Sequence, residues 1–237
     1  MTMEEYLHIN GGGNSPMQLI VAALNEELGI AATLREFKSI MGDLPILVVD
    51  GNSIDRTVEV AKDLGANIAF QDGFGKGDAI AKGISQLGNN TKYIILTDAD
   101  YTYPSKYIPA MIDVLEDYPE VGMVCGNRFG LPAEDKSFRR QFYLGNKMLT
   151  LAHNFILGAE LNDPLTGLRI VRSEIFKNWR IKSKGFDIEV ELNSQVLKQG
   201  YSIIEVPISY RSRIGEKKLR VRHGSTILKR ILLEGTP

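Results

Sequence analysis

The stretch Tyr93-Ile94-Ile95-Leu96-Thr97-Asp98-Ala99-Asp100 decides how the rest of the chain is organised. Its apolar and β-branched residues predict a buried parallel strand, and its two acids close that strand one residue apart. Ligands of open α/β sheets bind outside the carboxyl ends of the strands, so Asp98 and Asp100 are expected beside a ligand. Two carboxylates at this spacing can share one Mg²⁺ or Mn²⁺ ion whose coordination phosphate groups complete. Two solvated acids at a strand end are the alternative interpretation.

The composition indicates one globular domain, or one with a small appendage. The chain has 237 residues, of which 43% are hydrophobic, and a formal net charge of −1. This length allows a sizeable core. The single cysteine, Cys125, excludes a disulfide framework and is expected in the core. No apolar run reaches the length of a membrane-spanning helix, and no signal peptide opens the chain.

The near-neutral total hides a basic segment close to the C-terminus. Between Arg211 and Arg230 the chain carries eight lysines and arginines and a single acid, Glu216. Such a segment indicates a phosphate-bearing partner: a nucleotide, a lipid head group or a nucleic acid.

Strands and helices alternate along the first half of the chain, which predicts a doubly wound, mostly parallel sheet. Besides the stretch before Asp98, the runs that predict strands are Gln18–Leu24, Pro45–Val49, Ala66–Phe70 and Val121–Cys125. The helices between them are expected to begin at side-chain caps. Asn25 is placed to cap one of them, and Asn52 or Ser53 to cap the helix from Ile54 to Leu64.

The second half begins with a long helical pattern, Lys136–Leu157, rich in large apolar residues. It predicts either a core-packed helix or a surface helix at a membrane interface. Two strands follow, Leu168–Arg172 and Ser202–Val206, with a helix between them, and Gly224–Leu233 is expected to form a short basic amphipathic helix. We therefore divide the chain into a mobile N-terminus (1–16), an α/β domain (17–210) and a basic loop with a membrane-proximal helix (211–237).

A glycine-rich turn, Gly75-Lys76-Gly77, lies between a predicted strand and a predicted helix. Glycines allow a backbone to approach a diphosphate, and the lysine adds positive charge. Two known phosphate motifs do not fit, since a P-loop needs glycine at Phe70 and a dinucleotide fingerprint needs glycine at Ile80 or at Asp78. A plain glycine turn with an exposed lysine is the alternative.

Several motifs in order resemble the family-two inverting glycosyltransferases of GT-A fold. They are Leu24-Asn25-Glu26, Val49-Asp50-Gly51-Asn52-Ser53-Ile54-Asp55-Arg56-Thr57, Gly75-Lys76-Gly77-Asp78-Ala79 and Asp98-Ala99-Asp100. The second half resembles the dolichyl-phosphate (polyprenyl-phosphate) sugar synthases of that family. Its motifs are Gly126-Asn127-Arg128, Asp163-Pro164-Leu165-Thr166-Gly167-Leu168-Arg169, Glu205-Val206-Pro207-Ile208-Ser209-Tyr210-Arg211 and Arg213-Ile214-Gly215-Glu216-Lys217-Lys218-Leu219.

The resemblance implies a role for individual residues. Asp98 and Asp100 are expected to hold the metal, Mg²⁺ or Mn²⁺, and to be catalytic together with Arg128. The expected nucleotide-sugar site comprises Ala22, Asn25, Glu26, Asp50, Asn52, Lys76, Asp98, Ala99, Asp100, Arg213 and Lys218. The expected acceptor-phosphate site comprises Arg128, Arg139, Arg140 and Thr166. A turn scaffold explains Asp163, Thr166 and Arg169 equally well.

Two departures from the family pattern concern the metal and the nucleobase. Gly51 stands where the family often has a second acid after Asp50. Thr102 stands where it often has glutamine, which leaves a water or the Thr102 hydroxyl as the third metal ligand. The acids Asp187, Glu189 and Glu191 are expected to be solvated or paired with arginine rather than to act as a general base.

The implied activity is transfer of a sugar from a nucleoside diphosphate, UDP before GDP, to a polyprenyl or dolichyl phosphate, with inversion of the sugar. The protein is expected at the cytoplasmic face of the membrane, as a peripheral protein. A glycosyltransferase acting on a saccharide is the alternative. A nucleic-acid-binding protein is a further alternative, but the basic segment of this chain lacks the aromatic residues that stack on the bases of single strands. A nucleotidyltransferase would carry a glycine-rich loop where this chain has Asn25-Glu26-Glu27.

Overall fold

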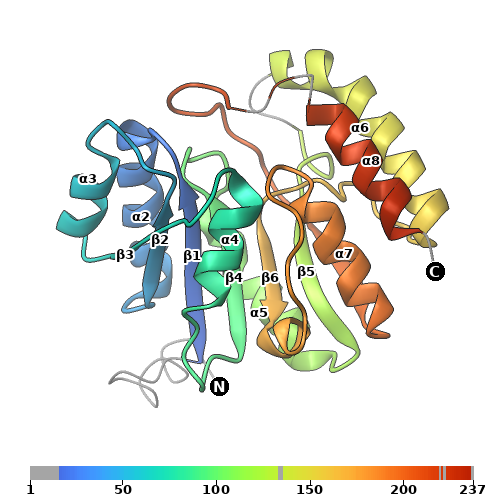
Figure 1. Cartoon of the computed structure of the whole chain (residues 1–237), viewed down its shortest axis with the longest axis horizontal. Helices are drawn as coiled ribbons and strands as arrows, with labels where there is room; N and C mark the ends of the chain where they lie inside the picture. The colour runs from blue at the N-terminus through green and yellow to red at the C-terminus, as the bar shows by residue number, and fades with distance from the viewer. Residues whose placement is uncertain (1–15, 133–135, 219, 221–222, 236–237) are drawn as a thin grey trace.

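The computed structural model describes residues 16–132, 136–218, 220 and 223–235, and the side chains of this part except those of residues 136–142. The prediction of a mobile N-terminus falls almost wholly on residues outside these ranges. Seven strands form one sheet in the order β3-β2-β1-β4-β6-β5-β7 (Figure 1). The strands are β1 (Met17–Ala23), β2 (Ile46–Asp50), β3 (Asn67–Phe70), β4 (Tyr93–Asp98), β5 (Val121–Asn127), β6 (Arg169–Arg172) and β7 (Ser202–Pro207).

The predicted mostly parallel sheet is confirmed. Strand β6 is the exception, because it lies antiparallel between β4 and β5. All other pairs are parallel, so the carboxyl ends of β1, β2 and β4 meet at one edge of the sheet. That edge is where ligands bind in open α/β sheets.

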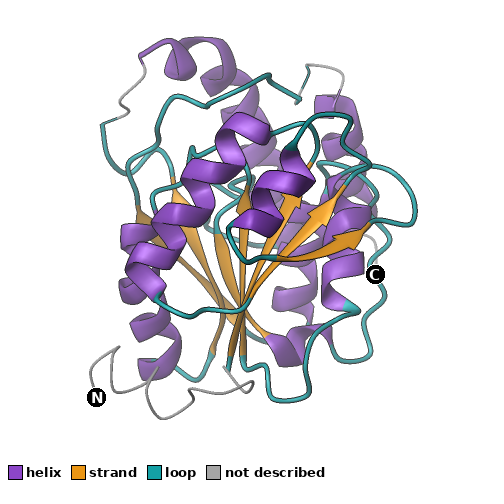
Figure 2. Ribbon diagram, turned by 90° about the vertical axis from the view of Figure 1, so that its left-hand side faces the viewer, coloured by secondary structure: helices purple, strands orange, loops and turns teal. Residues whose placement is uncertain are grey.

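Helices cover both faces of the sheet (Figure 2). They are α2 (Glu27–Met41), α3 (Thr57–Asp63), α4 (Lys76–Ile84), α5 (Ile108–Asp117), α6 (Lys136–Leu157), α7 (Ile188–Lys198) and α8 (His223–Glu234), with short 3₁₀ turns η1 (Ser105–Tyr107) and η2 (Ser173–Phe176). Helices α2, α3 and α5 share a core with Leu19 and Val21 of β1, whereas α4 and α7 share one with Ile20. A strand buried on both faces explains why its sequence is a continuous apolar run.

Helices α6 and α8 form a separate layer at one end of the molecule, where they pack side by side and α8 also packs on α7 (Figure 1). The predicted helix Lys136–Leu157 is confirmed with the same bounds. No helix in the described ranges combines the length and the hydropathy that a bilayer crossing demands.

The capping predictions for the first two helices are wrong. The N-cap residues are Glu26 for α2 and Arg56 for α3, and neither forms a side-chain cap hydrogen bond. The Asp55 carboxylate accepts from the first N–H of each helix, that of Glu27 at 3.1 Å and that of Thr57 at 3.0 Å. Instead, Asn25 Oδ1 accepts a hydrogen bond from the Ile54 N–H at 2.8 Å, and the Ser53 hydroxyl donates to Asp50 at 2.5 Å. Asn25 thus joins the loop after β1 to the loop after β2, and Ser53 bonds within the loop after β2. Both side chains bind loop groups and are not available to cap a helix.

Candidate active site

A cavity of about 790 Å³ opens at the carboxyl ends of β1, β2 and β4. Charged side chains from distant parts of the sequence face it: Glu26, Lys76, Asp98, Asp100, Arg128, Glu189, Arg213 and Lys218. Acids and bases therefore share one space, and Glu26, Asp98, Asp100 and Glu189 each have a cationic side chain within 4 Å.

Asp98, the last residue of β4, is paired with Lys76, the first residue of α4. Lys76 Nζ lies 2.6 Å from Asp98 Oδ1 and 2.7 Å from Glu189 Oε1 of α7. Burial alone would lower the pKa of Lys76, but the two carboxylates outweigh it and raise that pKa above its ordinary value. The lysine is therefore charged and held between two acids.

Asp100 is buried and lies in the loop that follows β4. The Thr102 hydroxyl donates to its Oδ1 at 2.6 Å, and Arg213 Nη1 lies 3.6 Å from its Oδ2. Burial and the neighbouring Asp98 charge raise the pKa of Asp100. Two carboxylates that repel each other in a buried position favour the arrival of a cation between them.

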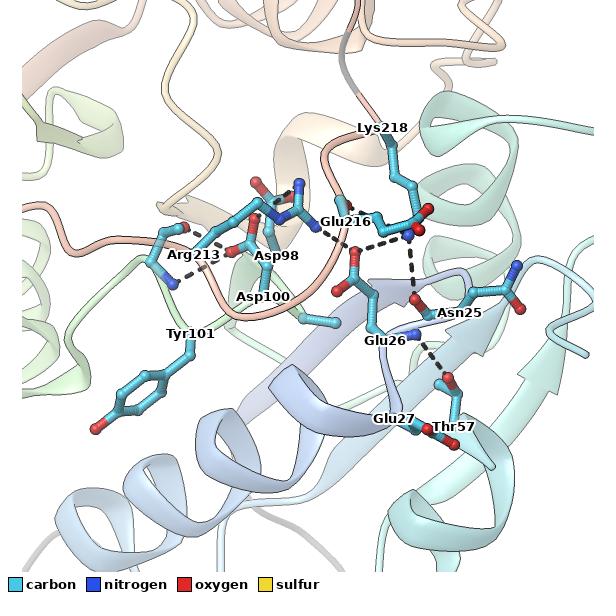
Figure 3. A network of polar contacts seen from close by, with 12 residues as sticks. Asn25, Glu26, Glu27, Thr57, Asp98, Asp100, Tyr101, Arg213, Glu216 and Lys218 are labelled. Atoms are coloured by element: carbon cyan, nitrogen blue, oxygen red, sulfur yellow. Dashed lines mark hydrogen bonds and ion pairs between the residues drawn. The ribbon is translucent and has the colours of Figure 1, made fainter. Parts of the chain in front are cut away.

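Glu26 holds the basic segment in place from the other side of the cavity (Figure 3). Its Oε1 accepts a short hydrogen bond from Arg213 and lies 3.6 Å from Lys218 Nζ. Among the described residues, its Oε2 and Nε of Arg213 are buried without a hydrogen-bond partner. Burial raises the pKa of Glu26 although both cations act against it.

Backbone hydrogen bonds fix the loop that carries these cations. The Ile214 N–H donates to the Asp100 carbonyl at 3.0 Å, and the Arg211 N–H donates to that of Thr102 at 3.1 Å. Arg211 also pairs with Glu36 of α2 at 2.5 Å. The loop therefore lies across the acid pair, and Figure 3 shows it passing directly over Asp98 and Asp100.

The glycine-rich turn Gly75-Lys76-Gly77 brings Gly75 and Lys76 to the cavity and packs against a neighbouring backbone segment. The N–H groups of Gly77 and Asp78 donate to the carbonyl of Lys184, at 2.9 and 3.2 Å. A Cβ at Gly75 or Gly77 would collide with the backbone of residues 183–184. The glycines are needed because two backbone segments touch there, and the Lys184 carbonyl accepts the hydrogen bonds of two N–H groups in the first turn of α4.

Arg128 lies deeper, at the end of β5. It forms a two-pronged pair with Asp163, with Nε and Nη2 each 2.7 Å from a carboxylate oxygen. Asp163 and Tyr103 raise the pKa of Arg128 against the effect of its burial. Asp163 is itself held by Glu205 Oε1, which accepts from its N–H at 2.6 Å. The guanidinium is thus rigid at the cavity wall.

The structure brings together most of the residues predicted for the nucleotide-sugar site, along with Arg128 of the predicted acceptor-phosphate site. Those that line the cavity are Ala22, Glu26, Lys76, Asp98, Ala99, Asp100, Arg128, Arg213 and Lys218. Asn25, Asp50, Asn52 and Thr166 do not line it. Both Asp50 oxygens bind Ser53, and the buried Thr166 hydroxyl has no hydrogen-bond partner in the described part of the chain. The side chains of Arg139 and Arg140 lie outside the described part.

Several residues that line the cavity were assigned no site role from the sequence, among them Gln71, Tyr103, Gly167 and Glu189. A Cβ on Gly167 would lie 2.6 Å from Asp98 Oδ2, so only glycine fits beside the acid pair. The expectation of arginine pairing is confirmed for Asp187, since Arg230 Nε lies 3.0 Å from its Oδ2. Glu189 differs, because it faces the cavity and binds lysine.

The donor atoms around Asp98 and Asp100 fit a hard divalent cation. They are carboxylate oxygens facing a cavity, and each already binds a cationic side chain. Within the described ranges, no group of three or more acids, histidines and cysteines is arranged to hold a metal. A cation here would need further oxygens from a phosphate or from water, as Mg²⁺ usually does at nucleotide sites.

Comparison with known proteins places the chain in a family. The family model described as Glycosyl transferase family 2 matches residues 18–180, and the chain belongs to this family. A dolichyl-phosphate hexose transferase from Haloferax volcanii is 32% identical over 206 residues, which are 86% of each chain. A dolichol-phosphate mannosyltransferase from Pyrococcus furiosus is 26% identical over 193 residues, 78% of this chain and 52% of that protein.

Solved structures of the same fold include a glucosyl-3-phosphoglycerate synthase from Mycobacterium tuberculosis in complex with Mn²⁺, UDP-glucose and phosphoglyceric acid. The TM-score is 0.75 at 18% identity, and the match covers 99% of this chain and 84% of that one. Another structure of that enzyme holds Mg²⁺ and UDP, with a TM-score of 0.75 at 19% identity over 100% of this chain and 85% of that one. The likeness confirms the GT-A fold.

Proposed function

We propose that this protein transfers a sugar from a nucleoside diphosphate sugar to a polyprenyl phosphate, with inversion at the sugar. The observation that carries the proposal is the cavity in which Asp98 and Asp100 face Lys76, Arg128 and Arg213. Two relatives are named dolichyl-phosphate hexose transferase and dolichol-phosphate mannosyltransferase, and one structural neighbour is in complex with Mn²⁺ and UDP-glucose.

The donor diphosphate is proposed to bind at Asp98 and Asp100 through Mg²⁺ or Mn²⁺. When bound, such an ion supplies positive charge to the leaving diphosphate. Lys76, Arg213 and Lys218 line the same space and, released from their acids, can pair with phosphate oxygens. These cations then stabilise the negative charge that grows on the leaving group.

The acceptor phosphate is proposed to bind near Arg128. A phosphate monoester is already anionic at neutral pH, so it needs orientation more than it needs a general base. The bidentate pair with Asp163 holds Arg128 at a fixed position in the wall. Attack by a phosphate oxygen on the sugar carbon, opposite the leaving diphosphate, inverts that carbon in one displacement.

Helix α6 supports peripheral association with a membrane. Leu144, Met148, Leu151 and Phe155 follow one another at spacings of four, three and four residues, and 62–90% of each is exposed. Such spacing puts all four on one face of the helix. The exposed Lys147 lies among them, and Asn146 of the same helix lines the cavity. We propose that this face and the basic segment 211–237 rest on an anionic, cytoplasmic membrane surface.

An acceptor comparison tests the proposed function. Purified protein is incubated with Mn²⁺ and labelled UDP-hexoses or GDP-mannose, and with either a short polyprenyl phosphate in detergent or an oligosaccharide. We expect label in the lipid fraction only, at a rate at least tenfold above that with the saccharide. Transfer to the oligosaccharide alone would replace the lipid phosphate by a saccharide acceptor.

A further inference from the structure

A buried arginine, Arg169, lies at the start of β6 and does not line the cavity. Only 1% of it is exposed, and its partners in the described part of the chain are neutral. Its Nε donates to the Thr166 carbonyl at 2.9 Å, its Nη2 to the Pro164 carbonyl at 2.6 Å, and its Nη1 to Asn193 Oδ1 of α7 at 2.5 Å. Hydrogen bonds from a charged donor are about twice as strong as neutral ones, so this arginine holds two backbone carbonyls firmly.

The two carbonyls belong to the turn 163–167, part of which lines the cavity. The first residue of the turn, Asp163, accepts two hydrogen bonds from the guanidinium of Arg128. The Thr166 N–H donates to the Asp163 carbonyl at 3.3 Å and closes the turn. Arg169 therefore fixes the backbone that directs Asp163 toward Arg128.

A chain of hydrogen bonds continues from Arg169 to α6, and its direction is fixed at every step. Because the guanidinium only donates, Asn193 turns Oδ1 toward it and Nδ2 away from it. This Nδ2 donates to the Pro164 carbonyl at 3.0 Å and to His153 Nε2 at 2.9 Å. His153 Nε2 is therefore unprotonated, and the Nδ1–H donates to Asn154 Oδ1 at 3.2 Å. Burial lowers the pKa of His153 to about 4, so the ring is neutral near pH 7.

The chain of hydrogen bonds returns to the segment just before the turn. Asn154 Nδ2 donates to the Leu161 carbonyl at 2.8 Å, and Asn154 Oδ1 accepts from the Leu161 N–H at 3.3 Å. Residues 161–166 are thus held by side chains of β6, α7 and α6 that do not line the cavity themselves.

We propose that Arg169, Asn193 and His153 are positioning residues for the acceptor phosphate. They hold the turn that carries Asp163, and Asp163 in turn holds Arg128 at the cavity wall. This inference rests on the proposed function and names residues that serve it without touching a substrate. The groups proposed to bind the donor belong to other segments, so a loosened turn should weaken the use of lipid phosphate more than the binding of nucleotide.

A matched pair of variants on β6 tests the inference. Arg169→Lys keeps the charge but loses the forked contact with the two carbonyls. Arg172→Lys makes the same change at the other end of the strand, where Nε and Nη2 donate to the carbonyls of Val121 and Leu115, far from the lining residues. Both variants should have a lowered melting temperature. Only Arg169→Lys should raise the apparent KM for polyprenyl phosphate, by at least about fivefold, while the Kd for UDP or GDP with Mn²⁺ changes less than about twofold.

A double variant shows whether Arg169 acts through Arg128. If it does, adding Arg169→Lys to Arg128→Lys should raise the KM for lipid phosphate by less than about twofold further, because both changes remove the same interaction.

His153→Phe and His153→Gln provide a second comparison, which decides the matter should Arg169→Lys fail to fold. Phenylalanine offers no acceptor to Asn193, whereas glutamine can offer its Oε1. His153→Phe should raise the KM for lipid phosphate at least about threefold, and His153→Gln should restore most of the loss.

Nitrogen NMR of the wild-type protein locates the proton on the His153 ring, and we expect the Nδ1–H tautomer. The inference is overturned, while the proposed function stands, if Arg169→Lys and Arg172→Lys raise the KM alike or not at all. Full additivity of Arg169→Lys with Arg128→Lys, equal KM values for the two His153 variants, or a proton on Nε2 would overturn it as well. Absence of transfer to lipid phosphate by the wild-type protein would contradict both.

Discussion

Asp98 and Asp100 are each held by a cation of the protein, Lys76 and Arg213, at the place where we propose that the donor binds. Asp98→Asn or Asp100→Asn removes one negative charge without removing volume. Since the charge on the leaving group is then less stabilised, we expect the transfer rate to fall at least about hundredfold. The melting temperature should change little, and Asp113→Asn on the exposed side of α5 should keep full activity. Near-normal turnover of either variant would remove its carboxylate from the mechanism.

Arg128 is paired with Asp163 in the structure, and we propose that it also binds the acceptor phosphate. Arg128→Lys keeps the charge but loses the two-pronged contact with Asp163. We expect the apparent KM for lipid phosphate to rise several-fold more than the Kd for the nucleotide. The broken buried pair should also lower the free energy of unfolding, by up to about 3–5 kcal/mol. An unchanged dependence of the rate on lipid concentration would separate Arg128 from the acceptor.

At the residue scale, the sequence alone predicted which charged residues belong to the candidate site, but it did not predict which side chains they contact. Asp98, Lys76 and Arg213 carry charges that a motif makes conspicuous. Gly167 stands in a family motif and Glu189 in an acidic group, but neither pattern predicts the 2.7 Å contact of Glu189 with Lys76 or the close approach of Gly167 to Asp98. Their roles come from tertiary packing, which no local pattern encodes.

Helix α6 presents an apolar face that the described core does not cover. Replacing Leu144, Met148, Leu151 and Phe155 by serine removes that face. We expect binding to anionic vesicles, measured by co-sedimentation, to fall at least about tenfold, since each buried apolar side chain contributes about 1.5–3 kcal/mol.

The matched control for α6 replaces Leu28, Ile54 and Phe74 by serine. These side chains are as exposed, with exposed fractions of 66–94%, but lie on α2 and on the loops after β2 and β3. Vesicle binding should survive this change. Equal losses in both variants would assign the effect to general hydrophobicity, and undiminished binding of the α6 variant would shift the membrane contact to the basic segment.

The contact between α4 and residues 183–184 makes a separate prediction about stability. Gly77→Ala places a Cβ against the Ser183 carbonyl, so we expect thermal unfolding several degrees below that of the wild type. Gly145→Ala in α6 meets no atom within 4 Å and should be neutral or stabilising by about 0.5–1 kcal/mol. If both variants melt alike, the backbone contact does not explain the glycine at position 77.

At the scale of elements, periodicity and composition predicted the alternating strands and helices, including both bounds of α6. They did not predict that β6 enters the sheet antiparallel between β4 and β5. Its four residues, Arg169–Arg172, are too few to carry a direction in their pattern. Strand order depends on long-range pairing, which local sequence does not fix.

Across the whole molecule, the site joins segments that lie far apart in the chain. Glu26 and Arg213 are 187 residues apart and form one ion pair over the cavity. The family motifs predicted that both belong to one site. The way in which the loop 211–218 rests on the acids follows from hydrogen bonds between its backbone and that of residues 100–102, which composition does not reveal.

The most direct test of the account is the thermal stability of the protein with UDP and with GDP, each with Mn²⁺ and with EDTA. We expect one nucleotide, at about a hundredfold excess over its Kd, to stabilise the fold by about 2.7 kcal/mol with Mn²⁺ and far less with EDTA. That amounts to several degrees for a chain of this length. No shift with either nucleotide, or the same shift in EDTA, would contradict a metal-assisted nucleotide site at Asp98 and Asp100.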